Sequence, residues 1–206
     1  IKEQTARLSQ LVGTLLDMTN LKSVPRTDQV TLEELVDEVF CDLDPVAEKA
    51  GISIHFDDSS SQDWHTDVHT PDASALNNNI RNMTGSYVLL YRAVYNLVEN
   101  AIKYNVDDGW VRVSIDADHK YFYVTVADSG MGIPEDSLER IFERFYRVDK
   151  SHSREIGGTG LGLAITRSTI AMHHGVIKVF SREGEGTTFS VRIPLSYICL
   201  LYTSPS

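Results

Sequence analysis

Cysteine, long uncharged runs and positive charge are all scarce in this sequence. Its two cysteines, Cys41 and Cys199, share no CxxC or Cys/His spacing, which gives no sign of a disulfide framework or thiolate metal site and favours a reducing, cytoplasmic setting. The longest stretch without Asp, Glu, Lys or Arg covers residues 193–206, shorter than the roughly 20 apolar residues that span a bilayer. No signal-peptide pattern opens the chain, so we expect a polypeptide that is not inserted in a membrane.

The acidic balance of the chain bears on its partners. Its 19 lysine and arginine residues face 29 aspartate and glutamate residues, which gives a net charge of −10. Such a chain has no general attraction for a phosphate backbone, so we expect no nucleic-acid partner and a local site for any anionic ligand. The 206 residues, 42% of them hydrophobic, allow one sizeable domain with a packed core plus an appendage, or two small domains.

Hydrophobic periodicity predicts helices and strands mixed along the chain. Helical patterns cover residues 31–51, 86–104 and 161–174. Period-two alternation predicts strands, and a weaker strand pattern surrounds Ile80. The clear strands lie at residues 52–56, 110–115, 121–127, 176–181 and 187–193, and the second and third of them form a predicted hairpin. This mixture of helices with antiparallel strands predicts an α+β fold.

Local signals mark several ends of these elements. Thr31 and Glu34 have the capping-box spacing at the start of the first helix, which is expected to end at Gly51. Ser86 is the expected N-cap of the second helix. His173 and His174 stand at the C-terminal end of the third helix, where the helix dipole favours a cation, and they need no catalytic role.

The globular pattern occupies residues 31–195, and different patterns flank it on both sides. Residues 1–24 carry apolar positions seven apart, an a/d heptad face that predicts a helix from a dimeric bundle; a helix lying on its own domain is the alternative. Residues 25–30 break that pattern and are interpreted as a linker. Residues 196–206 carry no charge and are interpreted either as non-native sequence or as a disordered end.

Polar residues on the second helix and after a strand form the first candidate sites. Asn96 and Asn100 lie four apart with Lys103 a turn further, and two amide oxygens with an ammonium suit a hard cation and phosphate. A solvated surface is the alternative for this set. Asp128 follows a hydrophobic strand and begins residues 128–134, a turn whose two glycines let a ligand approach the backbone; a simple glycine turn is the alternative.

A second glycine-rich run, residues 157–162, opens the third helix. Backbone N–H groups at a helix N-terminus bind phosphate, although this run matches neither the Rossmann nor the P-loop pattern. Between the two glycine loops lie four cations within eleven residues, which indicate a local anion site: Arg144, Arg147, Lys150 and Arg154. Acidic residues are interleaved with them, so a salt-bridged surface is the alternative.

Five motifs follow in an order that is similar to that of a known family. The chain contains NLVENAIKYN, DSGMGIP, IFERFYRVD, GGTGLGLAI and GEGTTF. They resemble the N, G1, F, G2 and G3 boxes of the ATP-binding domain of sensor histidine kinases of two-component systems. The resemblance covers residues 31–195, and residues 1–24 resemble the second helix of that family's dimerisation and histidine phosphotransfer domain. It implies a Bergerat-type two-layer α/β sandwich with a mixed sheet, preceded by a coiled-coil-like helix through which the protein forms a homodimer.

The resemblance also implies a site for two cofactors, ATP and Mg²⁺. The residues that it places on the nucleotide are Asn96, Asn100, Lys103, Tyr104, Asp128, Gly130, Gly132, Gly158, Gly160, Leu161, Gly162, Thr187 and Thr188. Asn96 and Asn100 are the implied metal ligands, and Asn96 takes part in catalysis together with Lys103 and with Arg147, a cation of a mobile lid.

The same resemblance implies a role for each residue of the adenine end. Tyr104 lies against the base, and Asp128 accepts a hydrogen from the adenine amino group. Gly130 and Gly132 let the nucleotide approach, and a hydroxyl of residues 187–188 assists in holding the base.

By this resemblance, the chain is the ATP-binding catalytic part of a sensor kinase and transfers the γ-phosphate of ATP to a histidine. No histidine precedes His55, so the acceptor is expected in a separate phosphoacceptor domain, with a response regulator as the next partner. Related ATPases such as gyrase carry a general-base glutamate where Asn96 stands, and an amide cannot take a proton at neutral pH. An ATP-hydrolysing or ATP-gated clamp and a non-catalytic interaction module are the alternatives. The implied setting is the cytoplasmic portion of a membrane-bound sensor.

Overall fold

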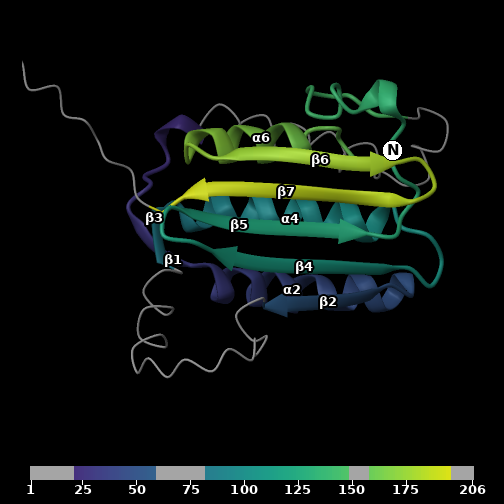
Figure 1. The fold of residues 1–206 in the computed structure, drawn as a ribbon, viewed down its shortest axis with the longest axis horizontal. Coiled ribbons are helices and arrows are strands. Elements are labelled where there is room, and N and C mark those ends of the chain that lie inside the picture. The colour runs from purple at the N-terminus through teal and green to yellow at the C-terminus, as the bar shows by residue number, and fades with distance from the viewer. Residues whose placement is uncertain (1–20, 59–81, 149–157, 196–206) are drawn as a thin grey trace, which may run out of the picture.

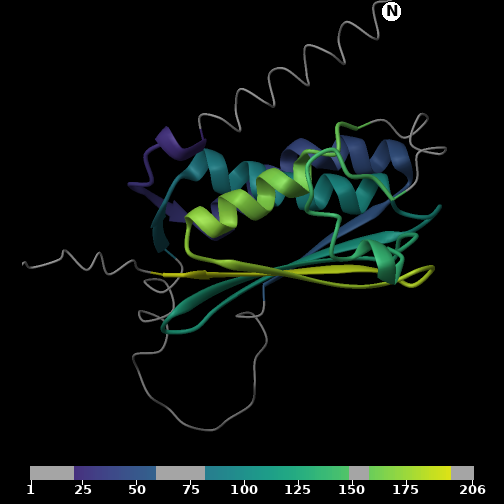
Figure 2. The same ribbon diagram turned by 90° about the horizontal axis from the view of Figure 1, so that it is seen from above.

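The computed structural model describes residues 21–58, 82–148 and 158–195. These residues form one five-stranded sheet with three helices packed against one of its faces, and no described helix covers the opposite face (Figures 1 and 2). The architecture is a two-layer α/β sandwich with a mixed sheet, which confirms the predicted α+β class.

The sheet has the strand order β2-β4-β5-β7-β6. Its strands are β2 (Ser53–Asp58), β4 (Trp110–Ala117), β5 (Tyr121–Asp128), β7 (Gly186–Pro194) and β6 (Val176–Arg182). Strand β2 pairs with β4 in parallel, whereas the other three pairs are antiparallel and include both the predicted β4–β5 hairpin and β6–β7. The central β5–β7 pair sets Asp128 opposite Thr187 at one end of the sheet, which brings two predicted site residues together.

The three helices are α2 (Leu32–Ala50), α4 (Tyr87–Lys103) and α6 (Gly162–Met172). The first ends at Gly51 with φ +70°, a left-handed conformation that suits glycine, as the sequence predicts. Thr31 and Ser86 are the N-cap residues of α2 and α4, as predicted, but neither makes a side-chain cap hydrogen bond, so the capping-box prediction at Thr31 is wrong. Thr31 has the extended backbone of a strand residue, and its pairing in that strand sets where the helix starts.

A small ladder beside the main sheet differs from the sequence prediction. Residues 25–30 were expected to be a linker, but β1 (Asp28–Thr31) pairs antiparallel with β3 (Asn82–Gly85). The strand expected near Ile80 therefore begins at residue 82, and Ile80 itself lies outside the described residues. Each strand is four residues long, and its partner lies about fifty residues away, so no local pattern signals the pairing.

The core lies between the sheet and the helices. Alternate residues of the central strands point into it, and each is at most 4% exposed: Val111, Val113, Ile115, Phe122, Val124, Val126, Phe189, Val191 and Ile193. They meet the apolar faces of the helices, in which Leu35, Val39, Leu43, Leu90, Leu97 and Ile170 are buried. Because apolar residues fill the middle of the layer, polar groups on this face gather where the strands and helices end.

The expected N-terminal helix and the uncharged tail fall largely on residues 1–20 and 196–206, which lie outside the described residues. Within residues 21–58, 82–148 and 158–195, no helix combines the length and apolar character needed to cross a bilayer.

Candidate functional site

Asn96 is held in place by the N-terminal part of α6. Its amide nitrogen donates to the carbonyl oxygen of Gly162 at 3.3 Å and to the hydroxyl of Thr166 at 3.5 Å. The buried Thr166 hydroxyl in turn donates to the carbonyl oxygen of Ala93 at 3.4 Å, on the same helix as Asn96. Both bonds use the amide nitrogen, so the Asn96 amide oxygen keeps its acceptor capacity for a cation or a water.

Lys103, Arg147 and Gly158 converge at the C-terminal end of α4. A Cβ added to Gly158 would lie 2.8 Å from Nζ of Lys103, and Arg147 donates a hydrogen bond to the Gly158 carbonyl oxygen at 2.9 Å. Burial lowers the pKa of Lys103 from its usual value; Glu99 raises it and Arg147 lowers it further. Two cations beside one glycine loop repel each other, and an anion placed between them relieves this repulsion.

The second glycine loop is fixed at the start of α6. Gly160 has φ +69°, and a Cβ there would lie 2.9 Å from the carbonyl carbon of Phe145, whose own N–H donates to the Gly160 carbonyl oxygen at 2.8 Å. Leu161 is fully buried, and its N–H donates to the Thr159 hydroxyl at 3.3 Å. The loop therefore has a defined path past Asn96 and Lys103, as an anion site at a helix N-terminus requires.

Asp128 lies at the end of β5 with its carboxylate half-buried. Its Oδ1 accepts the backbone N–H groups of Gly130 at 2.8 Å and Thr187 at 3.1 Å. Burial raises the pKa of Asp128 to about 6, although these two bonds oppose the shift. Within the described part of the chain both partners use Oδ1, which leaves Oδ2 as an acceptor for a ligand.

The two candidate threonines occupy different faces of the sheet. Thr187 pairs with Asp128 and is buried on the helix-facing side, in phase with the core residue Phe189. Thr188 pairs with Ala127 and points to the opposite side, because successive residues of a strand alternate. The structure thus brings Thr187, and not Thr188, to the carboxylate.

Gly130 and Gly132 serve close packing within the protein. A Cβ added to Gly130 would lie 2.4 Å from the Tyr104 carbonyl oxygen, and one added to Gly132, where φ is +69°, would lie 2.0 Å from the Arg182 carbonyl oxygen. The structure thus shows the backbone of neighbouring segments against both glycines, and the ligand-approach role that the sequence analysis gave them stays a prediction. The Tyr104 side chain lies near the glycine loop, with its hydroxyl 4.0 Å from a Cβ added to Gly158.

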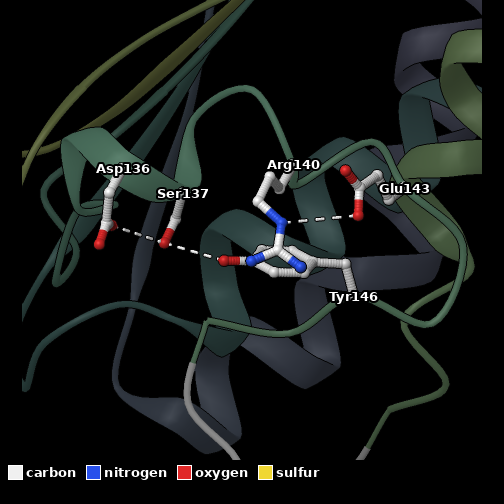
Figure 3. Close-up of polar contacts among 5 residues, drawn as sticks. All are labelled: Asp136, Ser137, Arg140, Glu143 and Tyr146. Atoms are coloured by element: carbon white, nitrogen blue, oxygen red, sulfur yellow. Dashed lines mark hydrogen bonds and ion pairs between the residues drawn. The ribbon is translucent and has the colours of Figure 1, made fainter.

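Part of the segment between the two glycine loops has its own polar network (Figure 3). The Tyr146 hydroxyl donates to Ser137 at 3.0 Å, and the Ser137 hydroxyl donates to Asp136 at 3.0 Å. The Arg140 guanidinium lies 4.4 Å from the Tyr146 ring centre and forms an exposed ion pair with Glu143 at 3.6 Å. This network lies within the segment itself, so Arg140 takes no part in the convergence at Gly158.

The structure places the four cations that were predicted to form an anion site in different surroundings. Arg147 contacts the glycine loop, whereas Arg144 is exposed. Lys150 and Arg154 lie outside the described residues.

Ser181 is a site residue that the sequence analysis missed. Its hydroxyl accepts the N–H of Ile133 at 2.8 Å, donates to the carbonyl oxygen of Gly186 at 2.8 Å and lies 2.9 Å from the Thr187 hydroxyl. One signal was available, because Ser181 is a polar residue at a core-facing position of the predicted strand 176–181.

A hollow of about 460 Å³ opens beside Ser181. It is lined by residues from 133–138 and 181–183, and neither Asn96 nor Lys103 is among its lining residues. Among the described residues no cluster of three histidine, cysteine, aspartate or glutamate side chains forms a metal site.

Comparisons with known proteins find one matching family and similar sensor kinases. Residues 85–197, more than half of the chain, match the family described as histidine kinase-, DNA gyrase B-, and HSP90-like ATPase. The sensor-like histidine kinase SenX3 of Mycolicibacterium smegmatis is 34% identical over 194 residues, which cover 93% of this chain and 46% of SenX3.

Two solved structures show the same fold. The catalytic domain of the histidine kinase ThkA has a TM-score of 0.62 and 27% identity, and the match covers 82% of this chain and 97% of that domain. Full-length ShkA in complex with AMPPNP has a TM-score of 0.70 and 26% identity, over 94% of this chain and 37% of ShkA. The chain spans less than half the length of the curated relatives it matches.

Proposed function

We propose that this chain binds Mg-ATP and passes the γ-phosphoryl group to a histidine. The premise is that the chain belongs to the histidine kinase-, DNA gyrase B- and HSP90-like ATPase family and is the ATP-binding domain of a sensor histidine kinase. The observation that carries the proposal is the convergence of Lys103 and Arg147 on Gly158, at one end of α4. In a chain with a net charge of −10, this is a local site for a polyanion.

The base end of the proposed site is built around Asp128. Oδ2 accepts a hydrogen from the adenine amino group, while Oδ1 stays bonded to Gly130 and Thr187. With its pKa raised to about 6, Asp128 is a carboxylate at neutral pH and is in the accepting form. Tyr104 lies against the base, and Thr187 supplies a hydroxyl beside the carboxylate.

The phosphate end uses amides and cations. The donor set suits magnesium, because Asn96 and Asn100 offer neutral oxygens on one face of α4 and the phosphates supply the charged ones. A bound Mg²⁺ neutralises charge that develops on the transferred phosphoryl group. Lys103 and Arg147 hold the phosphate oxygens, and residues 158–162 present backbone N–H groups to them.

Phosphoryl transfer is favoured over hydrolysis by the chemistry at position 96. The Asn96 amide cannot take a proton from water, and its nitrogen already donates to Gly162 and Thr166. The acceptor is then a histidine of a phosphoacceptor domain, to which residues 1–24 contribute a helix, and a response regulator receives the phosphoryl group from it. We place the domain on the cytoplasmic side of a sensor, where its substrate is abundant and where the exposed free thiol of Cys41 stays reduced.

Radiolabelled ATP tests this function directly. The chain is incubated with ATP and Mg²⁺ alone, with a supplied acceptor helix that carries an HELRTP-like histidine, and with the same helix carrying His→Ala. We expect slow, acid-labile labelling of the first helix only, because most of the rate comes from positioning the acceptor nitrogen, which a separate helix does poorly.

Two other outcomes contradict the proposal in different ways. Label on the chain itself places the acceptor histidine within this sequence. Rapid phosphate release without any helix makes the protein an ATPase or an ATP-gated clamp.

A further inference from the structure

The Ser181 hydroxyl joins three segments at the base end of the site. Its oxygen lies 2.8 Å from the N–H nitrogen of Ile133, 2.8 Å from the carbonyl oxygen of Gly186 and 2.9 Å from the hydroxyl oxygen of Thr187. Ile133 follows the first glycine loop, and Gly186 and Thr187 begin β7. All three partners are therefore within a few residues of Asp128 or of the residue that pairs with it.

Only one arrangement of hydrogens satisfies these contacts. An amide N–H always donates, so Ile133 uses one lone pair of the Ser181 oxygen. A carbonyl oxygen always accepts, so the single Ser181 hydrogen points to Gly186. The remaining contact then requires Thr187 to donate its hydroxyl hydrogen to Ser181.

The orientation of the Thr187 hydroxyl decides what it offers a ligand. With its hydrogen on Ser181, the Thr187 oxygen has only lone pairs left, and it stands beside a carboxylate that also only accepts. Thr187 is 7% exposed, so a free rotation of its hydroxyl toward bulk water is not available as an alternative. The polar groups at this end thus form a surface made of acceptors.

We infer that Ser181 is a positioning residue that sets base selectivity by holding the Thr187 hydroxyl as a direct acceptor toward the base. Resting on the nucleotide-binding function proposed above, this arrangement favours a base edge that presents an amino group over one that presents a carbonyl oxygen at the same position. A site that is built to accept rejects a carbonyl, because two acceptors face each other with no hydrogen between them.

The test compares ADP with IDP, which carries an oxo group in place of the 6-amino group and a hydrogen on N1; this pair of differences is the same for every variant compared. Dissociation constants of both, with Mg²⁺, are measured by calorimetry for the wild type and for Ser181→Ala. In the variant the Thr187 hydrogen is free to turn into the site, so we expect the preference for ADP over IDP to fall by about two- to tenfold, the range that one hydrogen bond contributes.

Three further variants separate positioning from folding. Ser181→Thr keeps the hydroxyl and is expected to retain the wild-type ratio of the two affinities. Ser190→Ala removes a serine hydroxyl from the opposite face of β7 and is expected to leave the ratio unchanged. In a Thr187→Val background, Ser181→Ala is expected to have no further effect on the ratio, because it acts through the Thr187 hydroxyl.

The outcomes distinguish this inference from the proposed function. If wild-type protein binds ADP and Ser181→Ala weakens both nucleotides equally, Ser181 is only structural and the inference is wrong. An unchanged ratio with unchanged affinities overturns it as well. If the wild type binds neither nucleotide, the proposed function itself fails and the inference falls with it.

Discussion

The imidazole of His173 accepts the backbone N–H of Ser86, with Nε2 3.0 Å from the nitrogen. The other ring nitrogen lies 2.8 Å from the Thr169 carbonyl oxygen, so the hydrogen is on Nδ1 and the ring is neutral. His173 is fully buried between the end of α6 and the start of α4. It therefore joins the two helices that carry the candidate site.

Acid should weaken this link. Burial lowers the pKa of His173 below its usual value; the Thr169 bond opposes the shift, and Arg26 and His174 add to it. Since the folded pKa lies below the unfolded value, protonation favours the unfolded chain, and the stability that His173 gives is lost as the pH falls below about 6.5. We expect His173→Ala to lower the free energy of unfolding at pH 7.5 by about 2–4 kcal/mol.

Urea unfolding at several pH values measures this effect. The loss caused by His173→Ala should shrink as the pH falls, because the wild type then loses the same contribution. His119→Ala, in an exposed turn, is the matched control and should change stability little at any pH. If the loss of unfolding free energy in His173→Ala does not depend on pH, the neutral form of the His173 ring is not the source of the stability.

Nucleotide affinity should depend on pH through Asp128. Because its pKa is about 6 and only the carboxylate accepts the amino hydrogen, affinity is expected to fall by up to about tenfold per pH unit below that value. Asp128→Asn should bind more weakly at pH 7.5. The nucleotide phosphates titrate in the same range, so the pH dependence of affinity in Asp128→Asn shows the contribution of the ligand alone. If wild type and Asp128→Asn have the same pH dependence of affinity, Asp128 does not accept the amino hydrogen.

Asn96→Asp should weaken Mg-ATP binding by about tenfold or more. A carboxylate cannot donate to the Gly162 carbonyl oxygen or to Thr166, and its charge repels the phosphates. Glu99→Gln, also on α4, is the comparison variant: it removes a charge that acts on Lys103 but leaves the Asn96 contacts intact, so we expect a smaller loss of affinity. Titration with a fluorescent ATP analogue at fixed Mg²⁺ measures both, and equal affinities would remove Asn96 from the site.

Two glycines with positive φ should respond differently to alanine. Gly184→Ala meets no atom within 4 Å, so its expected cost is the backbone strain of about 1–2 kcal/mol. Gly132→Ala has the same kind of strain and also sets its Cβ 2.0 Å from the Arg182 carbonyl oxygen, which adds at least about 2 kcal/mol. Thermal unfolding of both variants checks the difference, and equal melting temperatures would mean that the loop yields freely.

Residues whose signals are local could be predicted from the sequence. Gly51 ends α2 because it adopts a left-handed conformation, and the alternation around Val124 gives a strand in any compact fold. The N, G1 and G2 motifs likewise indicated Asn96, Asp128 and Gly158, although their roles stay predictions until nucleotide binding is measured.

Residues whose partners lie far along the chain could not be predicted. The β1–β3 pairing joins segments about fifty residues apart, and Ser181 acquires its role only when β6, β7 and the loop at Ile133 meet. His173 was interpreted as a favourable helix-end cation, which is wrong, because Ser86 and the surrounding core hold the ring neutral. Burial of this kind is a property of the assembled layers and leaves no mark on the neighbouring sequence.

The β1–β3 ladder has a mechanical consequence. Asp28 pairs with Gly85, and its carboxylate accepts the N–H of Tyr87 at 3.0 Å, in the first turn of α4. A pull along the chain before Asp28 therefore loads several backbone hydrogen bonds in shear, all at once, and reaches α4 without passing through α2. The β1–β3 pairing therefore couples the segment before Asp28 mechanically to the helix that bears Asn96.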